Sequence, residues 1–149
     1  MKIQTRYFGE VQISEDEIVK FKQGLPGFNI EKEFVILPFS EEETPYHILQ
    51  SVSTPSLAFV LGNPFVFFPD YEFELSESVT ELLEIQSEKE VAVYIILTIN
   101  EPFEKTTANL KAPVVINLNK GIGKQVVLNK EEYETKHFIM KEAVSKEGR

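Results

Sequence analysis

An apolar run of strand length that ends at a glycine and a proline constrains the fold of this chain more than any other feature. Residues 57–61 read Leu-Ala-Phe-Val-Leu, and a continuous apolar run of this length is typical of a strand covered on both faces. Gly62 and Pro64 interrupt it, because proline cannot donate a backbone hydrogen bond and restricts the residue before it. The sequence therefore predicts a buried strand that stops here.

The next patterned segment, residues 70–75, alternates between acidic and apolar side chains. Its members, in order, are Asp70, Tyr71, Glu72, Phe73, Glu74 and Leu75. A strand directs successive side chains to opposite faces. We therefore expect a strand with a row of carboxylates on one face and core on the other, beside a dense group of aromatic residues at positions 65–71.

Short strands separated by turn residues account for most of the remaining chain. The strand candidates with the clearest patterns are residues 2–8, 10–13, 18–21, 33–39, 46–52, 91–99, 113–118 and 124–128. Asn-Lys-Gly at residues 119–121 supplies a hairpin turn between the last two. About nine short strands with glycine and proline at their joints are typical of a closed or nearly closed antiparallel sheet.

One stretch, residues 78–86, is periodic like a helix. Val79 and Leu82 follow helical spacing, and a serine at its start is followed three residues later by a glutamate, as in a capping box. The expected fold class is thus mainly all-β, a compact antiparallel β-barrel-like single domain over residues 1–149 with this one short helix. Residues 140–149 are expected to form a frayed or helical tail.

Composition narrows the classes of function. A formal net charge of −9 at pH 7 argues against direct binding to nucleic acid or to an anionic membrane, since both need Lys and Arg. The chain has no cysteine, which removes disulfides and thiolate chemistry. Its first residues lack the apolar run of a signal peptide, and its longest apolar stretch, residues 91–99, is far shorter than a membrane span. We expect a cytoplasmic protein.

Residues that could perform chemistry occur without a recognisable pattern. His47 and His137 lie ninety residues apart and belong to no local nucleophile or metal motif. The alternating acids at 70–74 would sit about 6–7 Å apart per step on a strand, too far to converge on one ion. Residues 121–124, Gly-Ile-Gly-Lys, lack the spacing of a phosphate loop. We therefore assign no catalytic residue, no metal ligand and no cofactor.

Acidic charge is concentrated in one region. Residues 70–90 hold eight acids and one base, whereas residues 120–149 hold seven bases and five acids. Such a run is either a solvated face or a docking surface for a basic protein, where complementary charge sets the rate and orientation of binding.

Several motifs together are similar to the FliW family of flagellar assembly factors. They are, in chain order, GLPGF at 24–28, YHILQS at 46–51, GNPF at 62–65, PDY at 69–71, TANLKAPVVIN at 107–117 and QVVL at 125–128. Each short motif is weak alone, but their order and the long block at 107–117 make the resemblance specific. It spans nearly the whole chain except the tail.

The resemblance implies a non-enzymatic β-barrel-like protein that is a monomer when free and binds two alternative proteins. One is CsrA, a basic dimeric RNA-binding repressor of translation, contacted away from its RNA groove. The other is flagellin, held before export through its helical terminal region. Accumulated flagellin would occupy the protein and release CsrA, so that flagellin translation falls.

The resemblance does not say which residues contact CsrA. From charge, we predict that the contacts are Asp70, Glu72 and Glu74, with Tyr71 and Phe68 beside them as aromatic anchors. Two other readings stay open: a barrel with an aromatic-lined mouth that binds a small apolar ligand, and an enzyme of unrecognised type that uses His47 or His137.

Overall fold

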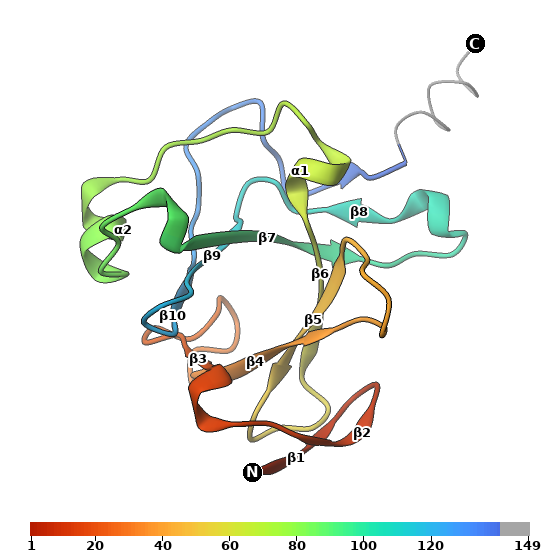
Figure 1. Cartoon of the computed structure of the whole chain (residues 1–149). Helices are drawn as coiled ribbons and strands as arrows, with labels where there is room; N and C mark the ends of the chain where they lie inside the picture. Colours follow the sequence, from red (N-terminus) through yellow and green to blue (C-terminus); the bar gives the residue numbers. More distant parts are fainter. Residues whose placement is uncertain (141–149) are drawn as a thin grey trace.

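Seven consecutive strands of a curved nine-stranded sheet close into a barrel, because the first and the last of the seven pair with each other (Figure 1). The computed structural model describes residues 1–140. Around the ring, the strands are β3 (Ile18–Lys20), β4 (Glu33–Pro38), β5 (Tyr46–Ser51), β6 (Ala58–Gly62), β7 (Val91–Thr98), β9 (Val114–Asn117) and β10 (Ile122–Gln125). Neighbouring strands are antiparallel except β3 and β10, which meet in one parallel bridge.

Four further strands lie outside the ring. β8 (Thr107–Ala108) pairs with the end of β7, β11 (His137–Phe138) pairs with β8, and β1 (Lys2–Thr5) forms a separate hairpin with β2 (Gly9–Gln12). The helical turns are η1 (Glu15–Glu17), α1 (Pro64–Phe67), α2 (Glu77–Leu82), η2 (Glu88–Glu90) and η3 (Phe103–Lys105). The expectation of a mainly β, barrel-like domain is confirmed.

Alternation along the strands sorts the apolar side chains into three clusters. One cluster draws residues from β3, β4, β5, β6, β7 and β9, so it fills the barrel interior, and Phe21, Phe34, Leu49 and Leu61 within it are completely buried. A second cluster lies between the outer face of β4–β6 and the β1–β2 hairpin. The third lies on the outer face of β7, β9 and β10, under residues 68–83. Both faces of the sheet are therefore core over most of its area.

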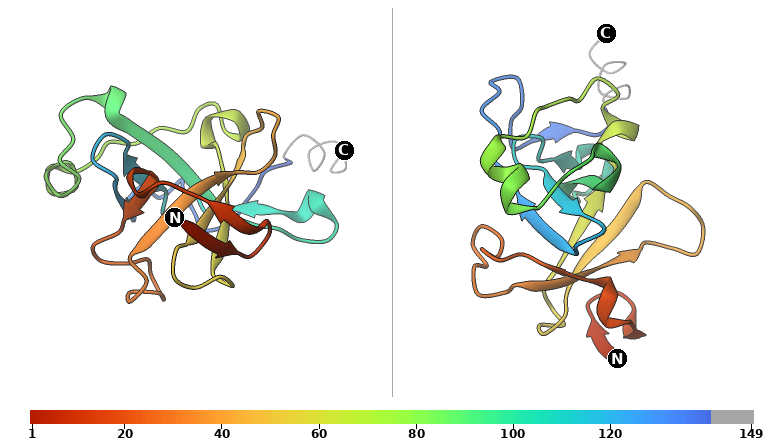
Figure 2. Two further views of the ribbon diagram at one scale, coloured as in Figure 1. Left: turned by 60° about the horizontal axis from the view of Figure 1, so that its bottom comes forward. Right: turned by 60° about the vertical axis from the view of Figure 1, so that its left-hand side comes forward.

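The predicted strand at residues 70–75 is wrong, although its alternation is real. Tyr71 is buried, and Phe73 and Leu75 are partly buried, whereas the acids between them are exposed. The backbone is extended but joins no sheet. The ring is closed, and β7 already pairs on both of its sides, so the barrel beneath this segment has no edge to offer it. We call residues 69–76 the strap, because they cross the outside of the barrel from α1 to α2 (Figure 2).

The helix predicted at residues 78–86 is shorter and starts earlier. Ser76, not Ser78, is its N-cap, and its hydroxyl accepts a hydrogen bond from the Val79 N–H. The chain leaves the helix at Glu84, whose φ of 54° is left-handed, while the Ile85 N–H bonds to the Thr80 carbonyl. This is a Schellman end with glutamate where glycine is usual.

The short helix α1 was not predicted from the sequence. Asn63 caps it by accepting a hydrogen bond from the Phe65 N–H at 3.0 Å, and Pro64 occupies its first turn. Asparagine followed by proline is a recognisable helix start. The tail expected at residues 140–149 lies outside the described residues from 141 onward.

Candidate protein-docking surface

The strap is fixed to the barrel by hydrogen bonds from two tyrosines. The Tyr71 hydroxyl donates to the Leu110 carbonyl at 2.7 Å. The Tyr133 hydroxyl accepts from the Glu72 N–H at 3.0 Å and donates to the Glu72 carbonyl at 3.1 Å. The two rings lie 4.7 Å apart, edge to face, and burial raises the pKa of Tyr71 strongly. The strap backbone is therefore held in one position.

Phe68 and Tyr71 lie in the core. They are 6% and 4% exposed and belong to the cluster under the strap. The exposed apolar side chains near the acids are instead Phe65 and Val66 of α1, at 49% and 57%. In this structure Phe68 and Tyr71 position the strap and present almost no surface to a partner.

The three predicted acids of the strap all face solvent. Asp70, Glu72 and Glu74 are exposed, and within residues 1–140 the two ion pairs join Lys2 to Glu10 and Lys120 to Glu84, so neither involves the strap acids. Lys130 donates to the Glu72 carbonyl at 3.1 Å rather than to a carboxylate. The structure thus brings the three charges onto one rigid, solvated segment.

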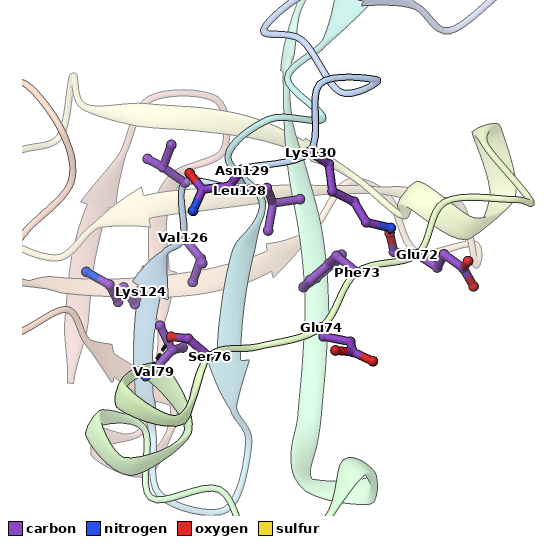
Figure 3. A pocket seen from close by; sticks show the side chains of 11 residues that line it. Glu72, Phe73, Glu74, Ser76, Val79, Lys124, Val126, Leu128, Asn129 and Lys130 are labelled. Carbon is purple, nitrogen blue, oxygen red and sulfur yellow. Dashed lines mark hydrogen bonds between the residues drawn. The ribbon is translucent and has the colours of Figure 1, made fainter.

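A groove with a volume of about 690 Å³ separates the strap from residues 124–130. Phe73 points from the strap into this groove on the side of Val126 and Leu128, whereas Glu72 and Glu74 point to the opposite side (Figure 3). Lys124 and Lys130 also line it. Glu72 and Glu74 border the groove as well, but their carboxylates are directed to the outer side of the strap, so the negative charge lies on that side.

The acidic surface continues onto α2. Glu77, Glu81 and Glu84 are exposed there, as is Glu88 in the next turn. The end of α2 is held by a side chain of β9: the Asn117 Nδ2 donates to the Leu83 carbonyl at 2.8 Å. The strap leads directly into α2 (Figure 2), and both segments carry exposed carboxylates.

His47 and His137 occupy different environments. The His47 ring lies 5.5 Å from the Tyr94 ring, and its Nδ1 atom is buried without a hydrogen-bond partner among residues 1–140. Burial lowers the pKa of His47 and raises that of Tyr94. The His137 Nε2 accepts a hydrogen bond from the Glu134 N–H at 2.8 Å. Among residues 1–140, no acid is hydrogen-bonded to His47.

The arrangement of possible metal ligands and the length of the helices bear on two other kinds of function. Among residues 1–140, no group of three or more His, Asp or Glu side chains is arranged to hold a metal ion. In the same part of the chain, no helix is both long and apolar enough to cross a membrane. A second hollow, lined by aromatic rings from three separate connections, was missed at the sequence level because no local pattern links its residues.

Comparisons with known proteins agree with each other. The FliW protein family model matches residues 2–139. The chain is 56% identical over 146 residues to the flagellar assembly factor FliW of Geobacillus sp. (strain WCH70), covering 98% of this chain and 100% of that one. It is 51% identical over 139 residues to the protein of the same name from Bacillus subtilis (strain 168), covering 93% and 96%.

A solved structure is also similar. The crystal structure of the flagellar assembly factor FliW superposes with a TM-score of 0.88 at 52% sequence identity, over 93% of this chain and 96% of that one. The likeness therefore extends over the barrel, the strap and the segments that hold it.

Proposed function

This chain belongs to the FliW family of flagellar assembly factors, and on that premise we propose that it binds the repressor CsrA and flagellin in the cytoplasm. It works by occupancy and performs no bond-making. Flagellin that accumulates before export occupies the protein, CsrA is released, and flagellin translation falls. Secretion of flagellin reverses the sequence.

The observation that carries the proposal is the set of exposed carboxylates on the strap. Asp70, Glu72 and Glu74 are held on a backbone that Tyr71 and Tyr133 fix by hydrogen bonds. Because the segment is rigid before binding, little conformational entropy is lost when a basic partner docks. Complementary charge then accelerates and orients the encounter.

This geometry supports antagonism without competition for the RNA groove of CsrA. A negative strap docked beside the groove would repel phosphates without entering it. At about 0.1 M salt, charges separated by more than about 10 Å are largely screened. The strap must therefore dock close to the RNA path, while Phe68 and Tyr71 keep it in place from beneath.

A small apolar ligand inside the barrel is a less favourable reading. The interior is filled by packed side chains, of which Phe21, Phe34 and Leu61 are completely buried. A protein partner needs only the outer surface. We propose that the protein is a monomer when free, with one surface offered to CsrA.

Charge reversal at the strap tests the proposal. In a D70K/E72K/E74K variant, the affinity for CsrA should fall by at least about tenfold at low salt, and the difference should shrink as salt rises. The matched control is E41K/E42K/E43K, which changes the net charge equally on a different exposed loop.

Titration of CsrA against both variants separates position from net charge. Equal losses in the two variants would show that CsrA binding does not distinguish the strap from the loop at residues 41–43. Unaltered affinity in the strap variant would remove the strap from the CsrA contact. Titration with a C-terminal flagellin fragment, alone and in competition with CsrA, then shows whether the two partners exclude each other.

A further inference from the structure

One part of the outer face of the barrel is left without a cover. The β1–β2 hairpin covers one region of β4–β6, and the strap with α1 and α2 covers β7, β9 and β10. Between these two covers, Ile48 of β5 and Val60 of β6 form the floor of an open groove with a volume of about 560 Å³. The groove is lined almost entirely by carbon.

Three chain connections supply the walls of this groove. Tyr7 and Phe8 come from the β1–β2 turn, Phe39 and Tyr46 flank the β4–β5 connection, and Ile99 and Phe103 belong to the β7–β8 connection. The three connections gather on the right-hand side of Figure 1. We call this hollow the aromatic groove.

The walls expose an unusual amount of apolar surface. Tyr7 is 49% exposed, Phe39 and Ile99 are 47% exposed, and Phe103 is 40% exposed. Single exposed apolar residues need no explanation, but a contiguous patch of them marks an interaction site. Burying these rings against a partner would remove apolar surface from water, which favours binding.

The groove is formed before anything binds. The Tyr46 ring lies 5.8 Å from Phe39 and 6.4 Å from Phe103. The Arg6 N–H donates to the buried Gln50 Oε1 at 3.0 Å, which fixes the β1–β2 turn. The Asn100 Nδ2 donates to the Lys105 carbonyl at 2.7 Å, which fixes the β7–β8 connection. These bonds place the walls on rigid supports.

The three connections that wall the aromatic groove carry more acidic than basic side chains. Glu41, Glu42 and Glu43 lie between the two wall residues Phe39 and Tyr46, and Glu101 and Glu104 lie on either side of Phe103; all five acids are exposed. The cations of the same connections are Arg6, whose guanidinium lies 5.2 Å from the Tyr7 ring, and Lys105. Five acids against two bases favour a ligand with apolar side chains in the middle and positive charge at its borders.

We propose that the aromatic groove binds an amphipathic helical segment of a partner protein, with apolar side chains at helical spacing and Lys or Arg along its borders. A helix fits better than an added strand, because β5 and β6 each pair on both sides and offer no edge. The inference does not depend on which protein the strap binds. It gives the molecule a second docking surface, separate from the acidic strap.

The test uses a fluorescently labelled helical peptide of leucine and lysine, with leucines at i, i+3, i+4 and i+7. Anisotropy is measured against the wild-type protein and against the variants Phe39→Ser and Phe103→Ser. Both side chains are partly exposed, so folding is retained, as circular dichroism would verify. We expect either substitution to weaken binding by about tenfold or more. Controls are Ile30→Ser and Phe65→Ser, at apolar residues exposed elsewhere, which should change binding less than about twofold.

The contribution of charge to peptide binding is tested with the same triple variants as in the CsrA experiment. The E41K/E42K/E43K variant should lose affinity for the peptide, whereas D70K/E72K/E74K should not. A peptide with glutamate in place of lysine should bind the wild-type protein more weakly. This pattern is the reverse of that expected for CsrA, so failure here and failure of the proposed function are distinguishable.

Three outcomes would overturn the inference. The first is peptide binding that is absent or is equally weakened by groove and control substitutions. The second is concentration-dependent dimerisation abolished by Phe103→Ser, which would assign the groove to a second copy of this chain. The third is binding of a small apolar dye in the groove without any groove-dependent peptide binding, which would assign it to a small ligand.

Discussion

Replacing Asn117 with alanine tests how the acidic helix α2 is held against the barrel. Asn117 lies in β9 with no solvent exposure. Its Nδ2 donates to the carbonyls of Leu83 and Glu84 at 2.8 and 3.2 Å, beyond the last turn of α2. Its Oδ1 accepts from the N–H groups of Asn119 and Lys120 at 3.0 and 3.2 Å, in the β9–β10 turn. One side chain thus joins a helix end to a hairpin turn.

The expected loss in the free energy of unfolding depends on which backbone groups lose their hydrogen-bond partner. Leu83 is completely buried, so its carbonyl has no water to replace the amide, at a cost of about 1–3 kcal/mol. The Asn119 and Lys120 side chains are exposed, so water can reach that turn and the loss there is smaller. We expect about 3 kcal/mol in total, which lowers the Tm of a domain this size by about 6–12 °C.

Substitution by aspartate separates the two halves of the interaction. Asn117→Asp keeps an acceptor for the hairpin turn but turns a carboxylate oxygen toward the two helix carbonyls. At neutral pH this variant should be less stable than Asn117→Ala, because a buried charge faces two acceptors. At low pH the protonated acid can donate, so the difference should narrow or reverse.

Urea unfolding and thermal melts at two pH values measure these effects, with Asn119→Ala as the control. That side chain is exposed, so its loss should change stability by less than about 0.5 kcal/mol. If Asn117→Ala cost no more than this control, or if the alanine and aspartate variants were equal at every pH, the assigned hydrogen bonds would not be holding the helix.

Three further predictions concern backbone conformation and pH. Gly24→Ala should be severely destabilising in denaturant unfolding, because the φ of Gly24 is +66° and an added Cβ would lie 2.5 Å from the Asn29 Cα. Gly9 is the control: it has the same φ but open space around it, so Gly9→Ala should lower the free energy of unfolding by only about 1–2 kcal/mol. Glu84→Gly should raise stability by about 0.5–1 kcal/mol in the same assay, because glycine relieves the left-handed φ of 54°, and a loss instead would show that the exposed ion pair with Lys120 outweighs this strain. Burial lowers the pKa of His47 in the folded protein below its unfolded value near 6.5. The neutral His47 side chain therefore contributes fully to stability above about pH 6.5, and this contribution declines as pH falls toward the folded pKa. The Tm of His47→Phe should therefore fall less than that of wild type between about pH 7.5 and 5, and equal slopes would contradict this account.

Local sequence patterns were sufficient to predict a strand where the segment pairs with neighbouring strands of the sheet. The runs at residues 46–52 and 91–99 became β5 and β7 almost as expected, and the turn at 119–121 joins β9 to β10. The motif order gave the family, which the comparisons confirm. The acids of the strap were also placed correctly on the exposed side of their segment.

The local pattern of an extended segment does not report whether the segment pairs with a sheet. The alternation at residues 70–75 indicates which side of the backbone is apolar, and the prediction of the apolar and acidic sides was correct. Pairing depends on a free edge nearby, and closure of the barrel through β7 and β9 removed it. For the same reason Tyr71 and Phe68 are core residues: the strap covers an outer face of the barrel, and its aromatic side chains fill the space beneath.

The amino-acid sequence alone determined the strand periods, the acidic character of residues 70–90 and the family. Tertiary structure alone decided that the strap is unpaired, that Asn117 holds α2, and that rings from three distant connections meet in the aromatic groove. The physical reason is that periodicity reports the two sides of one segment, whereas a surface depends on which other segments cover each side and which leave it open to water.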